Sequence, residues 1–229
     1  MKRALVIGNS DGIGLEVTRA LLRQDYEVFG ISKRAAPIVH DRYEHVVQDV
    51  TEPAYRDLLT GIVARHPDLD VCIYCAGIGG RFDLDNLSRD VRVFQVNLMA
   101  AVVTTELVLG HMVRRDAGHF IGLSSIADGL TSAEAPSYCA SKAGLSHYWE
   151  GLGLALASRK VKLTNVRFGF VDTKMARAPV RPFMMSTERA AAVILDAIAR
   201  PRLRVTRPLA TAILARILAL ATRIKLAMS

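Results

Sequence analysis

Cysteine is scarce in this sequence, and the apolar run near its N-terminus is short. Three cysteines in 229 residues cannot form a complete set of disulfide bonds, which is typical of a protein in a reducing compartment. Residues 1–8 are basic and then apolar, as in a signal peptide, but the apolar part soon breaks into glycine and Asp11. A first β-strand explains this segment better, so we expect a cytoplasmic protein.

Repeats, low-complexity linkers and metal-ligand patterns are also missing. Without a repeat or a linker we expect one large α/β domain, for which 229 residues are sufficient. Cys72 and Cys75 have the spacing of a zinc-binding pair, but no second Cys/His pair has suitable spacing, and the six histidines are scattered. We therefore interpret Cys72, Cys75 and Cys139 as packing residues and expect no metal.

Positive charge is in excess, with a net charge of +8 at pH 7. A basic surface of this kind can bind nucleic acid or an anionic membrane, but no nucleic-acid-binding motif accompanies the charge. We favour a solvated basic surface together with a pocket for an anionic cofactor, and we expect no nucleic-acid partner.

Strand-like and helix-like segments alternate along the chain. Short apolar segments predict strands at residues 3–7, 27–31, 45–48, 71–75, 119–123, 161–167 and 203–206. Helical spacing predicts helices at residues 13–24, 53–65, 91–114, 136–158 and 187–199. This alternation predicts an α/β fold, a Rossmann-like doubly wound parallel sheet in a single domain over residues 1–207. Ligands of such sheets bind beyond the carboxyl ends of the strands.

A glycine-rich turn follows the first predicted strand and opens the first predicted helix. Its sequence is Gly8-Asn9-Ser10-Asp11-Gly12-Ile13-Gly14. This is the context of a dinucleotide-binding turn: Gly8 permits the tight turn, Gly12 lets the backbone approach a pyrophosphate, and Gly14 allows the helix to pack closely on the strand. The helix N-terminus then offers N–H groups and partial positive charge to the phosphates.

Tyr138 and Lys142 lie four residues apart in a predicted helix, and Ser125 precedes the tyrosine by thirteen residues. Residues i and i+4 share one face of a helix. A nearby ammonium favours the phenolate, so we expect Lys142 to lower the pKa of Tyr138 toward a value useful for acid–base catalysis. In isolation, a tyrosine and a lysine at this spacing occur often by chance.

Taken together, these motifs resemble the short-chain dehydrogenase/reductase family over residues 2–175. Asn97, Ser125, Tyr138 and Lys142 match the four catalytic positions of that family in order and at its spacing. The segment Tyr74-Cys75-Ala76-Gly77 stands where the family usually has Asn-Asn-Ala-Gly. The resemblance and the turn imply cofactor contacts from Gly8, Ser10, Asp11, Gly12, Ile13, Gly14, Ser32, Lys33, Arg34, Asp49, Val50, Cys75, Ala76, Gly77, Tyr138, Lys142, Val171 and Thr173.

The resemblance also implies a role for each catalytic position. Tyr138 would be the general acid for reduction and the general base for oxidation, and Ser125 would hydrogen-bond the substrate oxygen. Lys142 would bind the nicotinamide ribose, and Asn97 would hold a water that links Lys142 to solvent. Ser124 competes with Ser125 for the serine role, but the distance of Ser125 from Tyr138 fits the family better. Asp49 would hydrogen-bond the adenine amine.

The cofactor preference is predicted from the end of the second strand. An NAD enzyme typically has an acidic residue there for the ribose hydroxyls, whereas this sequence has Ser32-Lys33-Arg34. Lys33 and Arg34 would attract a 2′-phosphate, so we expect NADP(H) in preference to NAD(H). Asp11 argues the other way, because many NADP-using relatives have a basic residue just before the second glycine.

These features predict an NAD(P)-dependent oxidoreductase that acts on a small carbonyl or alcohol. Two alternatives remain open, a dinucleotide-binding regulator or scaffold without turnover, and a relative that isomerises or reduces carbon–carbon double bonds. The sequence Arg167-Phe168-Gly169 lacks the family's usual proline before the glycine. Residues 174–186, which include Pro179, Pro182 and Phe183-Met184-Met185, form either a connecting loop or an open apolar substrate mouth.

Residues 208–229 continue beyond the nucleotide-binding fold as an apolar helical extension. Residues 209–221 are rich in good helix formers, while Arg216 and Arg223 interrupt the apolar run that a spanning helix needs. The helix packs on its own domain or on another subunit of a homo-oligomer (dimer or tetramer), or it makes peripheral contact with an anionic membrane. In each case its removal should change oligomeric state or membrane association.

Overall fold

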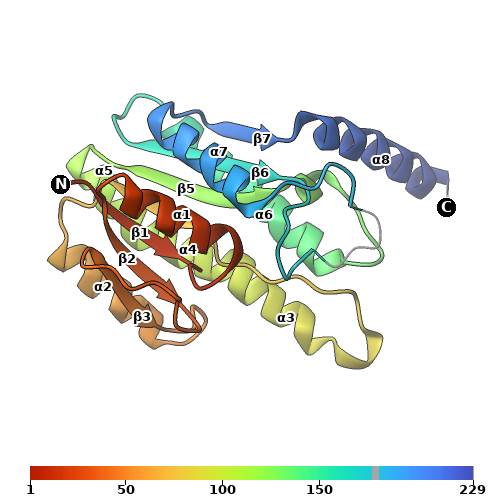
Figure 1. Cartoon of the computed structure of the whole chain (residues 1–229). Helices are drawn as coiled ribbons and strands as arrows, with labels where there is room; N and C mark the ends of the chain where they lie inside the picture. The colour runs from red at the N-terminus through yellow and green to blue at the C-terminus, as the bar shows by residue number, and fades with distance from the viewer. Residues whose placement is uncertain (177–180, 229) are drawn as a thin grey trace.

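Seven strands form one parallel sheet in the computed structural model, which describes residues 1–176 and 181–228 (Figure 1). The strands are β1 (Arg3–Ile7), β2 (Glu27–Ser32), β3 (Tyr43–Val47), β4 (Val71–Tyr74), β5 (His119–Ser125), β6 (Lys162–Phe168) and β7 (Arg204–Arg207). Their order across the sheet is β3-β2-β1-β4-β5-β6-β7, and every neighbouring pair is parallel. This is the single-domain, Rossmann-like fold that the alternating pattern predicts.

The strand order reverses between β1 and β4, which lie side by side in the middle of the sheet. Ile7 pairs with Tyr74, and the backbone N–H of Cys75 donates to the carbonyl of Ile7 at 2.8 Å. The turn after β1 and the segment after β4 therefore leave the sheet next to each other. A reversal of this kind is where open α/β sheets bind their ligands.

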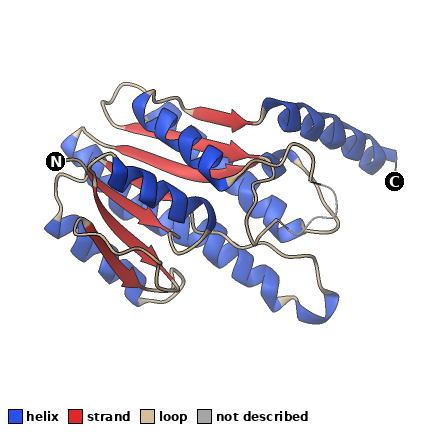
Figure 2. Ribbon diagram, in the orientation of Figure 1, coloured by secondary structure: helices blue, strands red, loops and turns tan. Residues whose placement is uncertain are grey.

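Helices cover both faces of the sheet (Figure 2). On one face α1 (Gly12–Arg23) packs beside α7 (Thr187–Ala199) over a core that includes Val17 and Ile194. The other face is covered by α2 (Ala54–Arg65), by a helical stretch over residues 88–115 and by α6 (Pro136–Ala155). The fully buried Trp149 of α6 lies in that second core.

The stretch 88–115 is continuous but is not a plain α-helix as the spacing predicts. It consists of α3 (Ser88–Phe94), a π-helical segment (Gln95–Met99), α4 (Ala100–Thr104), a second π-helical segment (Thr105–Leu109) and α5 (Gly110–Arg115). A buried side chain holds each π segment: the hydroxyl of Tyr74 donates to the carbonyl of Val96 at 2.6 Å, and Trp149 Nε1 donates to Thr105 Oγ1 at 3.1 Å. π segments are rare and concentrate at functional sites.

This same stretch is the one helix in the described residues that is long and apolar enough to cross a membrane by length and composition. Half of its most apolar window is buried inside the domain, as in the core helix of a globular protein.

The final helix, α8 (Leu209–Met228), leaves the body of the molecule after β7 (Figure 1). Only its first two turns pack on the domain, where Thr211 and Ala215 are buried against β7 and residues 126–129. Packing on its own domain, one of the alternatives above, is therefore wrong for the rest of the helix. Large apolar side chains along α8 are exposed.

Candidate active site

The glycine turn has the backbone geometry that its sequence predicts. Gly8 and Gly12 have φ angles of +85° and +53°, in the region that favours glycine. A Cβ added at Gly8 would lie 2.5 Å from the backbone nitrogen of Ala76, and one at Gly14 would lie 2.2 Å from the carbonyl oxygen of Gly8. The turn, the segment after β4 and the first turn of α1 are thus packed backbone to backbone, and Ser10 and Ile13 in this region are partly buried.

Asn9 ties this turn to β3, a role that the sequence does not indicate. Its side chain is fully buried, and Nδ2 donates to the hydroxyl of Tyr43 on β3 at 2.6 Å. The partner lies 34 residues away, so no local pattern indicates the contact.

Asp11 caps α1 and is surrounded by positive charge. Its carboxylate accepts from the backbone N–H of Gly12 at 2.7 Å, so this N–H is not free for a phosphate as the turn motif predicts. Lys174 lies 2.7 Å and Arg34 3.8 Å from the same carboxylate, and the Lys174 contact holds the pKa of Asp11 below its usual value. A cavity of about 300 Å³ opens beside Asp11, between the turn and residues 172–174.

The predicted basic loop after β2 is exposed and tied to acidic neighbours. Ser32 is buried and its hydroxyl donates to the carbonyl of Arg34 at 2.8 Å, whereas the side chains of Lys33 and Arg34 are 73% and 70% exposed. Lys33 Nζ lies 3.0 Å from a carboxylate oxygen of Asp49, and Arg34 lies 3.8 Å from one of Asp11, so both basic side chains are exposed and paired.

The side chain of Asp49, which the resemblance assigns to the adenine amine, is only 14% exposed and already accepts several hydrogen bonds. Arg92 donates to it at 2.5 Å, and both the backbone N–H and the hydroxyl of Thr51 donate to Oδ1. Burial opposes ionisation, but these donors together with Lys33 keep the pKa of Asp49 well below its usual range. The adjacent Val50 packs on the core.

The segment after β4 brings small residues to the centre of the site. Cys75 and Ala76 are partly buried, and burial raises the pKa of the Cys75 thiol to about 12, as expected for a packing residue. A Cβ at Gly77 would lie 3.5 Å from Asn97 Oδ1, 3.7 Å from Lys142 Nζ and 3.9 Å from Met175 Cε. Gly77 therefore marks the point where residues of four separate segments meet.

Tyr138 and Lys142 share one face of α6, as predicted. Lys142 Nζ lies 5.9 Å from the centroid of the Tyr138 ring and donates to the carbonyl of Leu123 at 2.9 Å. Burial lowers the pKa of Lys142 to about 8. The prediction that Lys142 lowers the pKa of Tyr138 is wrong for this arrangement, because burial raises the pKa of the phenol and only a hydrogen bond with Ser125 opposes that rise appreciably.

Ser125 stands at the carboxyl end of β5, within hydrogen-bond reach of Tyr138. Besides that contact, its hydroxyl donates to the carbonyl of Phe168 at 3.3 Å and accepts from the N–H of Ala127 at 3.1 Å. Ser124 faces the core instead, with its hydroxyl bonded to the carbonyl of Lys142 at 3.1 Å. The geometry thus favours Ser125 over Ser124 as the serine of the site.

Asn97 is fully buried in the first π segment, and its side chain is committed to structure. Its Oδ1 accepts from the N–H of Ile78 at 2.7 Å, while Nδ2 donates to the Ile78 carbonyl at 2.9 Å and to Ser141 Oγ at 3.1 Å. The amide therefore fixes the segment after β4 against α6. A water held by this side chain, as the resemblance implies, would have to replace one of these bonds.

Residues 171–176 and 181–186 form a loop that borders the site, where Met175 comes close to Gly77 and Gly79. Val171 pairs with Met185, and Thr173 Cγ2 lies 3.1 Å from where a Cβ on Gly12 would be. Met175 lies over the residues after β4, and the side chains of Phe183 and Met184 are 60% and 42% exposed. The described part therefore presents apolar surface, as an open apolar mouth would; Pro179 lies outside the described residues.

A buried ion pair behind Ser125 was also missed. Arg167 donates through Nε to Asp128 Oδ2 at 2.6 Å and through Nη2 to Oδ1 at 2.5 Å, with only 16% and 6% of the two side chains exposed. Ser146 donates to the same carboxylate and lies 2.8 Å from Ser124. The pair joins the end of β6 to the turn that follows Ser125.

Within the described residues, no group of three or more His, Cys, Asp or Glu side chains could hold a metal ion. The three cysteines are free thiols.

Comparisons with known proteins place this arrangement in context. A family model described as short chain dehydrogenase matches residues 2–181. An uncharacterized oxidoreductase of Myxococcus xanthus is 31% identical over 222 residues, which cover 90% of this chain and 87% of the relative. The 3-oxoacyl-(acyl-carrier-protein) reductase of Escherichia coli is 28% identical over 190 residues, which cover 77% of this chain and 76% of the reductase.

Solved structures share the fold over almost the whole chain. A short-chain dehydrogenase from Streptomyces avermitilis matches with a TM-score of 0.83 at 24% identity, covering 99% of this chain and 96% of its own. A short chain dehydrogenase from Burkholderia cenocepacia, solved in complex with NADP, matches with a TM-score of 0.83 at 23% identity, covering 97% and 98%. At these identities the likeness shows the fold alone.

Proposed function

The chain belongs to the short-chain dehydrogenase family of oxidoreductases, and we propose that it reduces a small carbonyl compound with NADPH, using Tyr138 as the general acid. The observation that carries this proposal is that Tyr138 and the buried Lys142 share one face of α6, with Lys142 Nζ 5.9 Å from the centroid of the Tyr138 ring, and that Ser125 at the end of β5 is close enough to interact with Tyr138. The three groups come from β5 and α6 and meet at the carboxyl end of the sheet, where a carbonyl oxygen could accept two hydrogen bonds at once.

The residues present fit a dinucleotide. The turn at Gly8 and Gly14 has no room for side chains, and it opens α1, whose N-terminus favours phosphates. Gly77 leaves space beside Lys142 for the nicotinamide ribose. When bound, the reduced nicotinamide supplies the hydride.

The protein residues then have separate tasks. Ser125 orients the substrate oxygen, and Tyr138 donates the proton that this oxygen takes up. Lys142 binds ribose hydroxyls beside Tyr138. Asn97 fixes the geometry of the segment after β4 against α6.

The state of Tyr138 favours reduction at neutral pH. Because burial raises the pKa of Tyr138, the phenol is protonated and ready to act as an acid. Oxidation of an alcohol needs the phenolate, so its rate should rise with pH well beyond neutrality, while the rate of reduction should not.

The preference for NADPH rests on the exposed Lys33 and Arg34. Each charge-assisted hydrogen bond to a 2′-phosphate is worth about 1.5–3 kcal/mol, so Arg34→Ala should weaken NADPH binding about tenfold or more and leave NADH binding unchanged. Arg159→Ala, which removes an exposed positive charge elsewhere, is the matched control. Tighter binding of NADH than NADPH by the unmodified protein would refute the preference.

The proposed reaction is tested by following NADPH consumption with a panel of ketones, 3-oxoacyl thioesters and enones. Turnover of ketones or 3-oxoacyl thioesters supports the proposal. Turnover of enones alone would indicate a double-bond reductase, and tight NADPH binding without turnover of any substrate would indicate a regulator or scaffold.

A further inference from the structure

Positive charge is concentrated in one segment of the chain. Residues 200–229 contain seven basic and no acidic residues, so residues 1–199 account for only one of the eight net positive charges. The acidic partners that balance arginines and lysines in the rest of the domain are missing from this part of the sequence.

A hollow lined by arginines lies between α7 and β7. It measures about 320 Å³ and is bordered by Arg189, Arg200, Arg202 and Arg207. Its one carboxylate, Asp196, is paired with Arg200 at 2.7 Å. Within the described part of the chain, no ion pair joins Arg189, Arg202 or Arg207 to an acidic side chain. The hollow therefore suits anionic groups such as phosphates.

α8, which follows β7, presents an exposed apolar face. Ile213, Ile217, Leu220 and Ile224 recur at helical spacing on one face, and each is 53–61% exposed. Leu214 and Leu218 widen the face. A helix of 20 residues is about 30 Å long. Its exposed apolar side chains therefore form a continuous patch, unlike the single apolar residues that are scattered over most protein surfaces.

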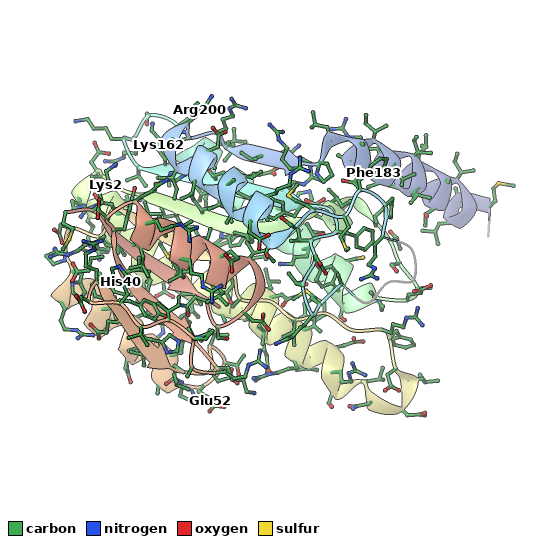
Figure 3. The ribbon with its side chains drawn as sticks, viewed as in Figure 1. Lys2, His40, Glu52, Lys162, Phe183 and Arg200 are labelled. Atoms are coloured by element: carbon green, nitrogen blue, oxygen red, sulfur yellow. The ribbon has the colours of Figure 1, made fainter. Side chains whose placement is uncertain are left out.

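The hollow and the helix belong to one side of the molecule. β7 is the edge strand of the sheet and runs directly into α8, and Figure 1 shows the two end to end along one margin. Arg200 lies at the same margin (Figure 3). The side combines phosphate-binding groups with an apolar helix.

Either a second copy of this chain or an anionic membrane could cover the arginine hollow and the apolar face of α8, and their charge distinguishes the two. A second copy docking by two-fold symmetry would bring the same patch against itself, and thus the arginines of the hollow, of which only Arg200 is paired, against their own copies. An anionic bilayer complements both the charge and the apolar face. We infer that residues 200–228 form a docking surface for membranes rich in anionic phospholipid, with the apolar face of α8 at the boundary between headgroups and acyl chains and the hollow on lipid phosphates.

This docking would bring the active site close to the lipid. α8 starts at the carboxyl end of β7. Ser125 lies at the carboxyl end of β5, at the same end of the parallel sheet, and Tyr138 lies in the first turn of α6. Phe183, in the loop that borders the site, is exposed (Figure 3). Apolar carbonyl compounds that partition into a membrane would then reach the site from the bilayer.

The test is co-sedimentation of the full chain with vesicles of phosphatidylcholine alone or mixed equally with phosphatidylglycerol. We expect at least tenfold tighter binding to the mixed vesicles, decreasing as salt is raised. Ile217→Glu and Leu220→Glu should each reduce binding at least tenfold, and Arg202→Gln should reduce it about fivefold. Val39→Glu and Arg159→Gln make the same chemical changes at exposed positions elsewhere and should bind like the unmodified chain.

Light scattering without vesicles and NADPH binding are measured for each variant, to report association and folding. Equal binding to both vesicle types, or no binding by the unmodified chain, would overturn the inference without the need for any variant. Loss of a dimer in Ile217→Glu with vesicle binding unchanged would identify a second copy as the occupant and would also overturn it.

Discussion

Replacing Arg167 by methionine should destabilise the domain strongly, because it leaves the carboxylate of Asp128 buried without its partner. Two charge-assisted hydrogen bonds, at 2.6 and 2.5 Å, join the pair, and only 6% of the Asp128 side chain is exposed. Removing one partner of a buried ion pair costs about 3–5 kcal/mol, mostly through the uncompensated charge. Ser146 alone cannot replace the lost guanidinium.

The magnitude is checked by urea unfolding followed through the fluorescence of Trp149, which is fully buried in the folded state. The double variant Asp128→Leu with Arg167→Met removes both charges, so we expect it to regain more than half of the lost stability. Arg56→Met is the control, because Arg56 pairs with Glu106 on the surface and both side chains are about half exposed. Its midpoint should hardly move.

A loss of less than about 1 kcal/mol in Arg167→Met would refute this reasoning. So would a double variant that is less stable than the single one, because the cost would then arise from lost contacts rather than from an unpaired charge.

Two further predictions concern the fold and the turn. Burial lowers the pKa of His119 to about 4, so between pH 6.5 and 4 the unfolded chain takes up a proton that folded His119 refuses, and stability falls as pH falls. Urea unfolding at pH 7 and pH 5 should show a His119-dependent loss of about 2 kcal/mol that His119→Gln lacks; an equal loss in both proteins would contradict the assignment. Gly14→Ala would place a Cβ 2.2 Å from the Gly8 carbonyl and should weaken NADPH binding more than tenfold, whereas Gly61→Ala in α2 meets nothing within 4 Å and should raise the melting temperature slightly. Unchanged NADPH affinity in Gly14→Ala, measured by thermal shift, would show that the turn tolerates a side chain.

Local pattern predicts most of the fold. Apolar segments such as Val71–Tyr74 and the helical spacing of Thr187–Ala199 carry their own signal, and each prediction lies within a few residues of the observed element. The glycine turn is predictable for the same reason, since its requirement for positive φ angles is local. The two π segments are not predictable, because they depend on Tyr74 and Trp149, which lie far away in the sequence.

In the candidate site, too, local features are predictable from the sequence and long-range contacts are not. Tyr138 and Lys142 are one helical turn apart, so their shared face follows from spacing alone. The pairs Asn9–Tyr43 and Asp128–Arg167 are separated by 34 and 39 residues and form only once the sheet is assembled. The pKa of Tyr138 was predicted in the wrong direction because spacing shows the neighbouring lysine but not the burial of the phenol.

The central claim is that Tyr138 donates the proton, and Tyr138→Phe tests it most directly. The variant loses only the hydroxyl, so it should bind NADPH as the unmodified chain does while kcat for ketone reduction falls by at least 100-fold, the lower range for loss of general acid catalysis. Lys142→Ala should differ by weakening NADPH binding as well as lowering kcat. NADPH binding by thermal shift and single-turnover reduction are measured on the same preparations. A Tyr138→Phe protein that retains near wild-type turnover would contradict the account.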